Sequence, residues 1–176
     1  TDNEALILNG NVVLDFPNGI LKAGKARVDR KNGLVNFKKE GDLFLENYFF
    51  RAKEGFFGKD DESIELYYGQ TFLKDRNIVL TFDELKGNLN NKILLKQVSM
   101  TSCADPRAGW QFLAESIELD DQSKRGSAKK VKVNILDKTI LRLPYVPFAT
   151  SSERMTGFLE PSLSYSSDGL DFMIPY

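Results

Sequence analysis

Alternation of apolar and polar residues, shifted at regular intervals, is the feature that most constrains how this chain folds. Three segments repeat one pattern, in which an alanine is followed by a two-residue gap before the next apolar or small residue: LKAGKARV (21–28), FRAKEGFF (50–57) and FLAESIEL (112–119). Such a gap shifts a period-two alternation by one residue, which is the effect of a β-bulge. The repeat therefore predicts strands that carry a bulge after Ala23, Ala52 and Ala114.

The spacing of these bulges indicates a repeat unit of about thirty residues. A weaker copy, LTFDELKG (80–87), has Phe82 in the alanine position, so the anchors are separated by 29, 30 and 32 residues. Gly10, Gly41 and Gly69 form a second series with similar spacing. Two strands per unit cannot bury an apolar face alone, whereas stacked copies can. Accidental similarity between hairpins is the alternative, but it does not require the bulge to recur in phase.

Individual strands and turns are visible as well. Asn-Gly pairs at 18–19 and 32–33 lie between alternating segments and indicate hairpin turns. The spacing of Trp110, Leu113 and Ile117 would also suit a short amphipathic helix, but the repeat at Ala114 favours a strand there. We predict an all-β fold, an open twisted antiparallel β-jellyroll made of two packed sheets with almost no helix. Pro144 and Pro147 exclude a central strand at 143–148.

Composition excludes several functional classes. The 176 residues have a net charge of -1, no histidine and one cysteine. Histidine-based triads, histidine metal sites and an internal disulfide are thereby excluded, and a near-neutral chain is untypical of nucleic-acid binding. The acidic clusters at 60–62 and 120–121 are typical of solvated loops rather than of calcium sites. We expect no enzyme activity, no metal and no cofactor.

The last third of the chain differs from the repeats. Lys129, Lys130 and Lys132 belong to a basic stretch that fits the solvated face of a strand or, alternatively, contact with anionic lipid head groups. The segment SLSYSSDGLDFMIPY (162–176) predicts one strand, a turn at Asp168-Gly169 and the start of another strand. We expect the natural chain to continue beyond it.

Two sets of motifs resemble a known family. LNGNVVL (8–14) and the alanine-anchored strands resemble OstA-type domains of periplasmic lipopolysaccharide-transport proteins. TSC (101–103), Trp110, LPY (143–145) and the R-x-x-GFL-x-P segment at 154–161 follow in the order seen in the LptD family of outer-membrane lipopolysaccharide-assembly proteins. This resemblance covers essentially the whole chain.

The resemblance implies a fold, a location and partners. It implies that residues 1–148 are a V-shaped periplasmic OstA-like jellyroll, and that residues 149–176 are a connector and the first strand or strands of an outer-membrane β-barrel. It implies that the lipid A part of lipopolysaccharide is received from the bridge protein LptA, and that the lipoprotein LptE binds through the barrel. It also implies a disulfide between Cys103 and a cysteine near the barrel's C-terminal end, although the second N-terminal cysteine frequent in the family is absent here.

The expected lipid-binding face consists of the residues on the period-two apolar face of the early strands. These are Leu6, Leu8, Val12, Leu14, Val35, Phe37, Leu43, Leu45 and Phe50. Lys39 lies in phase with Phe37 and Leu43, which leaves two arrangements. In an open groove Lys39 faces inward and its ammonium reaches water, whereas in a closed core a bulge near 38–40 turns it outward. The first strand, 6–16, is expected to be an unpaired edge that accepts a strand of the bridge protein.

Two other functions fit parts of the sequence. A soluble bridge subunit of the same pathway would consist of repeats alone, without the GFLEP segment (157–161) and the final strand. A repeat β-domain that binds glycan or protein at the cell surface would present aromatic residues on an exposed face.

Overall fold

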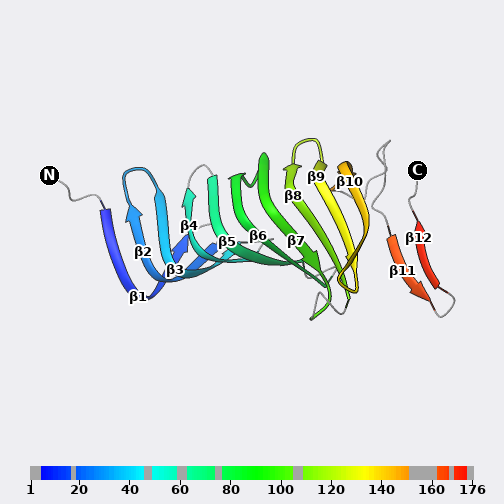
Figure 1. Cartoon of the computed structure of the whole chain (residues 1–176). Coiled ribbons are helices and arrows are strands. Elements are labelled where there is room, and N and C mark those ends of the chain that lie inside the picture. Colours follow the sequence, from blue (N-terminus) through cyan, green and yellow to red (C-terminus); the bar gives the residue numbers. More distant parts are fainter. Residues whose placement is uncertain are drawn as a thin grey trace.

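Ten strands follow one another in a single antiparallel meander (Figure 1). The computed structural model describes residues 5–16, 19–45, 49–58, 63–73, 77–104, 109–150, 162–166 and 169–173. Each strand pairs with the strands that precede and follow it in sequence, so short hairpin connections suffice. The strands are β1 (Ala5–Phe16), β2 (Gly19–Asp29), β3 (Leu34–Leu45), β4 (Phe49–Gly58), β5 (Ser63–Leu73), β6 (Ile78–Asn88), β7 (Lys92–Thr101), β8 (Trp110–Asp120), β9 (Arg125–Ile135) and β10 (Lys138–Ala149).

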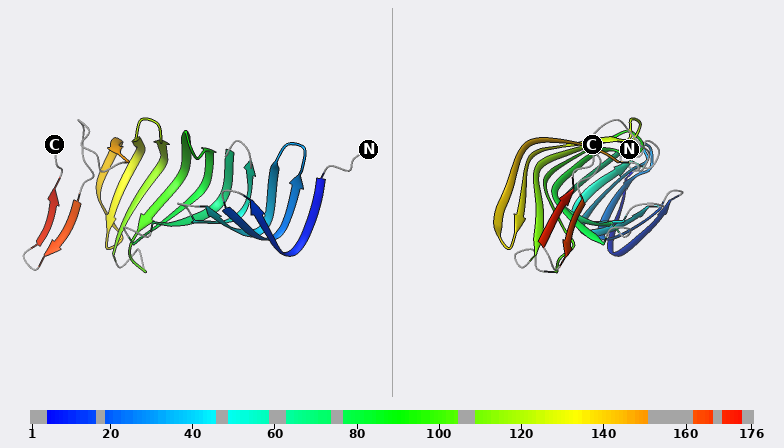
Figure 2. Two further views of the ribbon diagram at one scale, coloured as in Figure 1. Left: turned by 180° about the vertical axis from the view of Figure 1, so that it is seen from behind. Right: turned by 90° about the vertical axis from the view of Figure 1, so that its right-hand side faces the viewer.

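The all-β prediction is confirmed, but the prediction of two packed sheets is wrong. The ten strands form one continuous open sheet, and no helix occurs among the residues that the structure describes. The end view in Figure 2 shows that the strands are bent, so the single sheet folds over on itself and two parts of it face each other. Each strand thus contributes one half to each of two arms. The segment around Trp110 is strand β8, as the repeat predicted.

The predicted shifts of phase are present, but the extra residue does not lie in the strands of the anchors. Burial changes phase after Ala23 in β2, Ala52 in β4 and Ala114 in β8. Where the β2–β3 and β3–β4 registers shift, the extra residue belongs to β3, whose Lys39 and Glu40 lie opposite single residues of β2 and β4. All the anchors are buried, with Ala23, Ala52, Phe82 and Ala114 between 2% and 7% exposed. The bulge re-aims the side chains beyond it, so both halves of a bent strand keep their apolar residues on the inside.

The intervening strands carry a second series of irregular positions. Lys39 and Glu40 in β3, Tyr68 in β5, Gln97 in β7 and Lys130 in β9 have positive φ angles between 51° and 64°. In the first three of these strands, β3, β5 and β7, these positions recur at intervals of 29 residues, counted from Lys39 to Tyr68 and on to Gln97. The left-handed conformation places these side chains on the outside of the bend, where all five are exposed.

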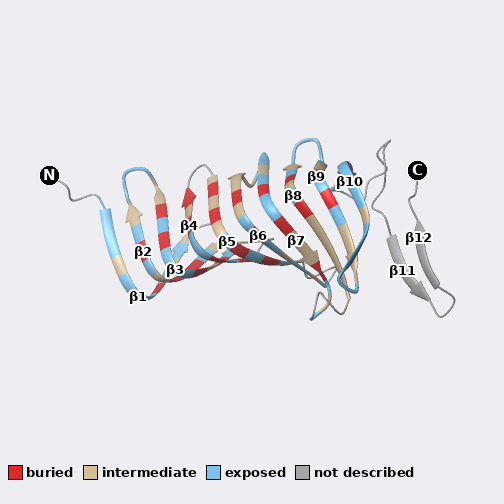
Figure 3. Ribbon diagram, viewed as in Figure 1, coloured by how far each residue is buried: buried red, intermediate tan, exposed pale blue. Residues whose placement is uncertain are grey.

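The hydrophobic core lies between the two arms and extends along the sheet. Figure 3 shows buried residues alternating with exposed ones along the strands. Aromatic rings pack against glycines in this core: a β-carbon on Gly41 or Gly55 would collide with the Phe37 ring, and one on Gly69 would collide with the Phe82 ring. At these positions glycine leaves free the space that a large aromatic ring occupies, which a β-carbon would fill.

The two ends of the sheet differ from its centre. β1 and β10 are the edge strands, so Pro144 and Pro147 lie in an edge strand as their chemistry requires. Beyond β10, β11 (Ser162–Ser166) pairs with β12 (Gly169–Met173) in a separate two-stranded sheet, which agrees with the predicted strand pair. Asp168 of the predicted turn and the segment 154–161 lie outside the described residues.

Candidate functional site

The structure brings the nine predicted lipid-binding residues onto one face. Residues paired across strands share a face of the sheet, and the pairing connects the predicted set through shared neighbours. Leu8 lies opposite Ala26, which in turn lies opposite Phe37. Leu14 lies opposite Leu21, and Leu21 opposite Leu43, which pairs with Phe50. Leu6, Val12, Val35 and Leu45 belong to the same face, opposite Val28, Ala23, Phe57 and Gly19 in that order.

Burial divides this face into a closed centre and more open margins. Phe37 and Leu43 are each 1% exposed, and Val12, Val35 and Phe50 are also buried. Leu8, Leu14 and Leu45 are only half-buried, and Leu6, near the beginning of the edge strand, is 40% exposed. The face is therefore a packed core over most of its width and becomes more accessible on the edge strand β1 and at Leu45, the last residue of β3.

Lys39 has the arrangement that a closed core requires. The pairing of β3 with β4 shifts register between Lys38 and Gly41, and Lys39 and Glu40 have left-handed φ angles of 64° and 55°. The extra residues turn Lys39 outward, where it is exposed. An inward Lys39 is thus wrong for this structure, and the physical reason is the cost of placing an ammonium group beside the buried Phe37.

Most of the apolar face lies outside the set of residues predicted from the sequence. The buried cluster continues through every later strand up to β9, with partly buried members in β10. Its buried members outside the predicted set are Leu21, Ala23, Ala52, Phe57, Ile64, Leu66, Phe82, Leu85, Leu95, Val98, Ala114, Ile117, Ala128 and Val131. Period-two alternation read with a one-residue shift at each bulge would have found them.

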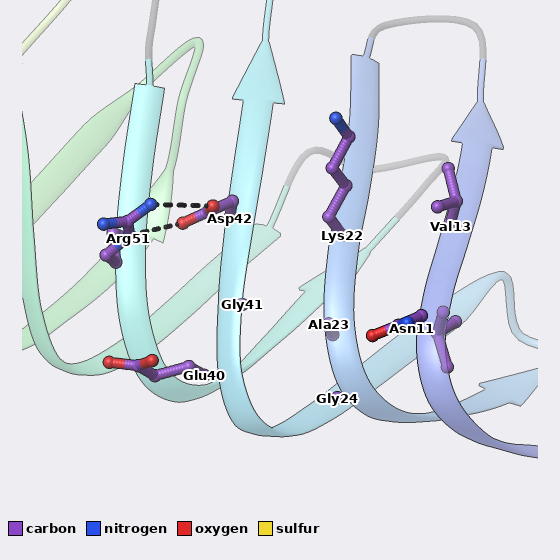
Figure 4. Close-up of a pocket in the computed structure, with 10 residues that line it drawn as sticks. Asn11, Val13, Lys22, Ala23, Gly24, Glu40, Gly41, Asp42 and Arg51 are labelled. Atoms are coloured by element: carbon purple, nitrogen blue, oxygen red, sulfur yellow. Dashed lines mark hydrogen bonds and ion pairs between the residues drawn. The ribbon is translucent and has the colours of Figure 1, made fainter.

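A hollow of about 460 Å³ lies on the opposite, outer face of β1 to β4 (Figure 4). Its polar lining residues Asn11, Lys22, Glu40, Asp42 and Arg51 alternate along the strands with buried residues, so they point away from the core. Arg51 donates two hydrogen bonds to Asp42, at 2.7 and 3.0 Å, and this contact raises the pKa of the guanidinium. The charges are mixed and the strongest pair is already satisfied, so the hollow does not select a ligand of one charge.

Apolar side chains also form a row on the outer face of one arm. Ile20 pairs with Phe44, Phe44 with Phe49, and Phe72 with Val79. Phe72 is 45% exposed, the Phe44 and Phe49 rings lie 4.9 Å apart, and the Lys22 ammonium lies over the Phe44 ring. This row is the kind of exposed aromatic feature that the surface-binding alternative expects.

The TSC motif and Trp110 are held together by hydrogen bonds. The Thr101 hydroxyl donates to the Trp110 carbonyl at 2.7 Å, and the indole N–H of Trp110 donates to Ser102 Oγ at 3.0 Å. The backbone N–H of Cys103 donates to Thr101 Oγ1 at 3.0 Å. These contacts fix the end of β7 against the start of β8 and leave Cys103 half-buried with a free thiol. The disulfide of Cys103 stays a prediction.

The charged clusters singled out in the sequence have structural surroundings. Lys129, Lys130 and Lys132 are exposed on β9, and Lys130 forms an ion pair with Glu115 at 2.6 Å. Asp120 accepts backbone hydrogen bonds from 122 and 123 in a turn, which lowers the pKa of its carboxyl group. The acidic residues 60–62 lie outside the described residues.

The described part of the molecule shows neither a metal cluster nor a membrane-spanning helix. Within the described ranges, no group of three or more metal-ligating side chains comes together. No helix in those ranges is long and apolar enough to cross a membrane.

Comparison with curated proteins finds relatives in several bacteria. No protein-family model matches the chain. It is 29% identical over 176 residues to the LPS-assembly protein LptD of Idiomarina loihiensis, covering 99% of this chain and 23% of that protein. It is 28% identical over 178 residues to LptD of Acinetobacter baylyi, covering 96% of this chain and 21% of that protein. With LptD of Legionella pneumophila (strain Paris) the identity is 37% over 93 residues, which cover 52% of this chain and 11% of that protein.

A solved structure is loosely similar. The crystal structure of LptH, the LptA-homologous periplasmic component of the lipopolysaccharide transport device of Pseudomonas aeruginosa, superposes with a TM-score of 0.43 and 13% identity, covering 89% of this chain and 94% of that chain. The chain spans less than a quarter of the length of the curated relatives named above. Over nearly its own full length it is similar to the LPS-assembly proteins LptD, and the resemblance that its motifs indicated is confirmed.

Proposed function

We propose that this chain is the periplasm-facing part of an outer-membrane lipopolysaccharide-assembly protein, and that its inner face receives lipid A acyl chains and passes them to a barrel. The similarity to LPS-assembly proteins LptD supports this proposal. In it, residues 1–148 form the carrier domain, and residues 149–176 form a connector and the first strand or strands of the barrel.

The observation that carries the proposal is one apolar face that continues without interruption from β1 to β10. Exposure of an acyl chain to water costs about 0.8 kcal/mol per methylene, so a chain of a dozen carbons costs on the order of 10 kcal/mol. A continuous apolar lining lowers that cost along the whole length of the path. Transport of this kind requires no catalytic group.

Lipid entry requires the two arms to part, because Phe37 and Leu43 are closed off in this structure. Among the described residues, strand ladders join only strands that are adjacent in sequence. The arms therefore meet through apolar contacts rather than through hydrogen bonds, and opening breaks no ladder. Half-buried residues such as Leu14, Leu45 and Phe148 would contact an incoming chain first.

Photo-crosslinking in cells tests this path. A photoreactive amino acid replaces Leu14, Phe37 or Leu43 in the full-length protein, and Asn36 or Lys39 on the outer face as controls. The proposal expects lipopolysaccharide adducts from all three inner positions and few from the controls. Adducts from Leu14 alone would mean that the lipid stays at the margin and the core does not open, and equal labelling of both faces would contradict the path altogether.

The same proposal names partners and a location. The protein is placed in the cell outer membrane with this domain in the periplasm. The bridge protein LptA docks its terminal strand on β1, whose free edge is expected to continue one groove across two molecules. LptE binds through the barrel, and Cys103 pairs with a cysteine near the C-terminal end of that barrel.

The outer row of Phe44, Phe49 and Phe72 supports a second candidate function, binding of a glycan or protein at the cell surface. The double variant Phe44→Ser, Phe72→Ser separates the two. The carrier function expects it to retain lipopolysaccharide crosslinking from Phe37. The surface-binding function expects no such crosslink in either protein, and loss of binding to purified cell-surface polysaccharide in affinity electrophoresis.

A further inference from the structure

Both edges of the sheet expose large apolar side chains. On β1, Leu6, Ile7 and Val13 are 40%, 56% and 62% exposed, and on β10 Ile140 and Tyr145 are 58% and 54% exposed. Each edge strand is hydrogen-bonded to only one neighbour in the described sheet. An exposed apolar edge is a template for strand addition. Side-chain character alone would therefore make both edges docking sites.

The backbone of β1 is suited to accept a strand. Its pairing with β2 is regular over 5–9 and again over 12–16, with the bulge at Gly10 and Asn11 between them. Both five-residue runs lack proline, so every residue has an N–H group. Asp15 is the single charged residue of the strand.

The backbone of β10 is not suited to accept a strand. Its register shifts at Ile140, and Pro144 and Pro147 interrupt the remainder, so the longest regular run without proline has three residues, 141–143. Proline has no N–H group, and within a sheet it occupies positions whose nitrogen faces the open side. Both prolines therefore remove donors from the free edge. Lys138 and Arg142 add the charges that commonly protect an edge.

We propose that the two edges have opposite roles: β1 accepts a strand from a partner, and β10 blocks strand addition, so that a second copy of this chain cannot add to it head to tail. The partner strand at β1 must be apolar on both faces, since Leu6 and Leu8 lie on the inner side and Ile7 and Val13 on the outer side. The β1 half of this inference rests on the proposed docking there, whereas the β10 half stands independently of lipid transport.

Sedimentation velocity over a range of concentrations tests the block. The wild-type chain is expected to form nothing larger than a dimer, because β1 can pair only with a second β1 and that pairing closes. The double variant Pro144→Thr, Pro147→Thr restores two donors. Each hydrogen bond contributes about fivefold to an association constant, so an open series of β1–β10 oligomers should form with roughly 25-fold tighter association.

Two further variants identify the surfaces. Tyr145→Thr changes the same strand without restoring a donor and should behave as wild type. Adding Ile7→Lys and Val13→Lys to the double proline variant places charges on the exposed β1 edge and should abolish the series. The result that overturns the inference is a double proline variant with a native circular dichroism spectrum that remains the size of the wild type. Wild-type oligomers longer than dimers would overturn it as well. Neither result depends on lipid crosslinking, so failure of the proposed lipid path is recognised separately.

Discussion

Replacement of Gly41 by alanine should destabilise the protein through a single side chain, Phe37. A β-carbon on Gly41 would lie closer than 3.0 Å to carbons of the Phe37 ring. The ring has little room to move away, because Gly55 packs against its other edge so closely that even a β-carbon there would lie 2.8 Å from the ring. Phe37 is 1% exposed, so the collision occurs in packed core rather than at a surface.

The sign of the effect is decided by two opposing contributions. Gly41 has no positive φ angle, so alanine fits the backbone and should stabilise by about 0.4–1 kcal/mol through the unfolded state. Overpacking of a closed core costs about 1–3 kcal/mol. We therefore expect Gly41→Ala to lower the free energy of unfolding by about 1–2 kcal/mol. Phe37→Ala should cost about 3–5 kcal/mol on its own.

A double-mutant cycle isolates the contact. Without the ring, the alanine at position 41 has room, so Phe37→Ala, Gly41→Ala should be no less stable than Phe37→Ala. The coupling energy should then be at least about 1 kcal/mol. Urea denaturation followed by far-ultraviolet circular dichroism measures each free energy. Fluorescence of Trp110, on the distant strand β8, shows whether the sheet unfolds as one unit. Strict additivity, or a Gly41→Ala protein as stable as the wild type, would refute the reasoning.

Three further predictions follow from the site. Cys103 is half-buried with a free thiol, so a small thiol reagent should label it in the native chain, more slowly than in the unfolded chain. Complete protection of Cys103 in the native chain would contradict the prediction that a partner cysteine can reach it. The ammonium groups of Lys96 and Lys86 lower the pKa of Glu84, so this carboxylate stabilises the protein above pH 4.5, and the stabilisation is lost as the pH falls further. Glu84→Gln should therefore flatten the dependence of the unfolding free energy on pH in that acidic range. An unchanged pH profile would contradict this prediction. A photo-crosslinker at Ile7 should capture the bridge protein in cells, whereas capture only from Tyr145 on the β10 edge would reverse the proposed polarity.

Local signals predicted much of this fold. Period-two alternation and Asn-Gly turns depend on residues within one strand or hairpin, so they are readable without knowledge of distant contacts. The shift of phase after Ala23, Ala52 and Ala114 is local as well, because it is visible in the spacing of apolar residues within one strand. The same reasoning, extended to every strand, would have yielded nearly the whole apolar face.

The chemistry of the edges could also be predicted in part. Proline in 143–148 requires an edge or a strand end, and β10 is an edge. The strand at the beginning of a meander has one neighbour fewer, which is why β1 is the other edge. The difference between the two edges could not be predicted from the sequence, because the lengths of the regularly paired runs in β1 and β10 are known only from the register of the ladders.

The sequence by itself determined the strand period, the positions where the alternation changes phase and the apolar character of one face. Only the tertiary structure decided that the strands bend and form one sheet instead of two, that Lys39 turns outward, and that Phe37 occupies the space above Gly41. The physical reason is range: alternation and bulges follow from neighbouring residues, whereas the separation of the two arms depends on side chains that meet across the fold. That separation makes the centre of the inner face a packed core in this structure and leaves its margins accessible.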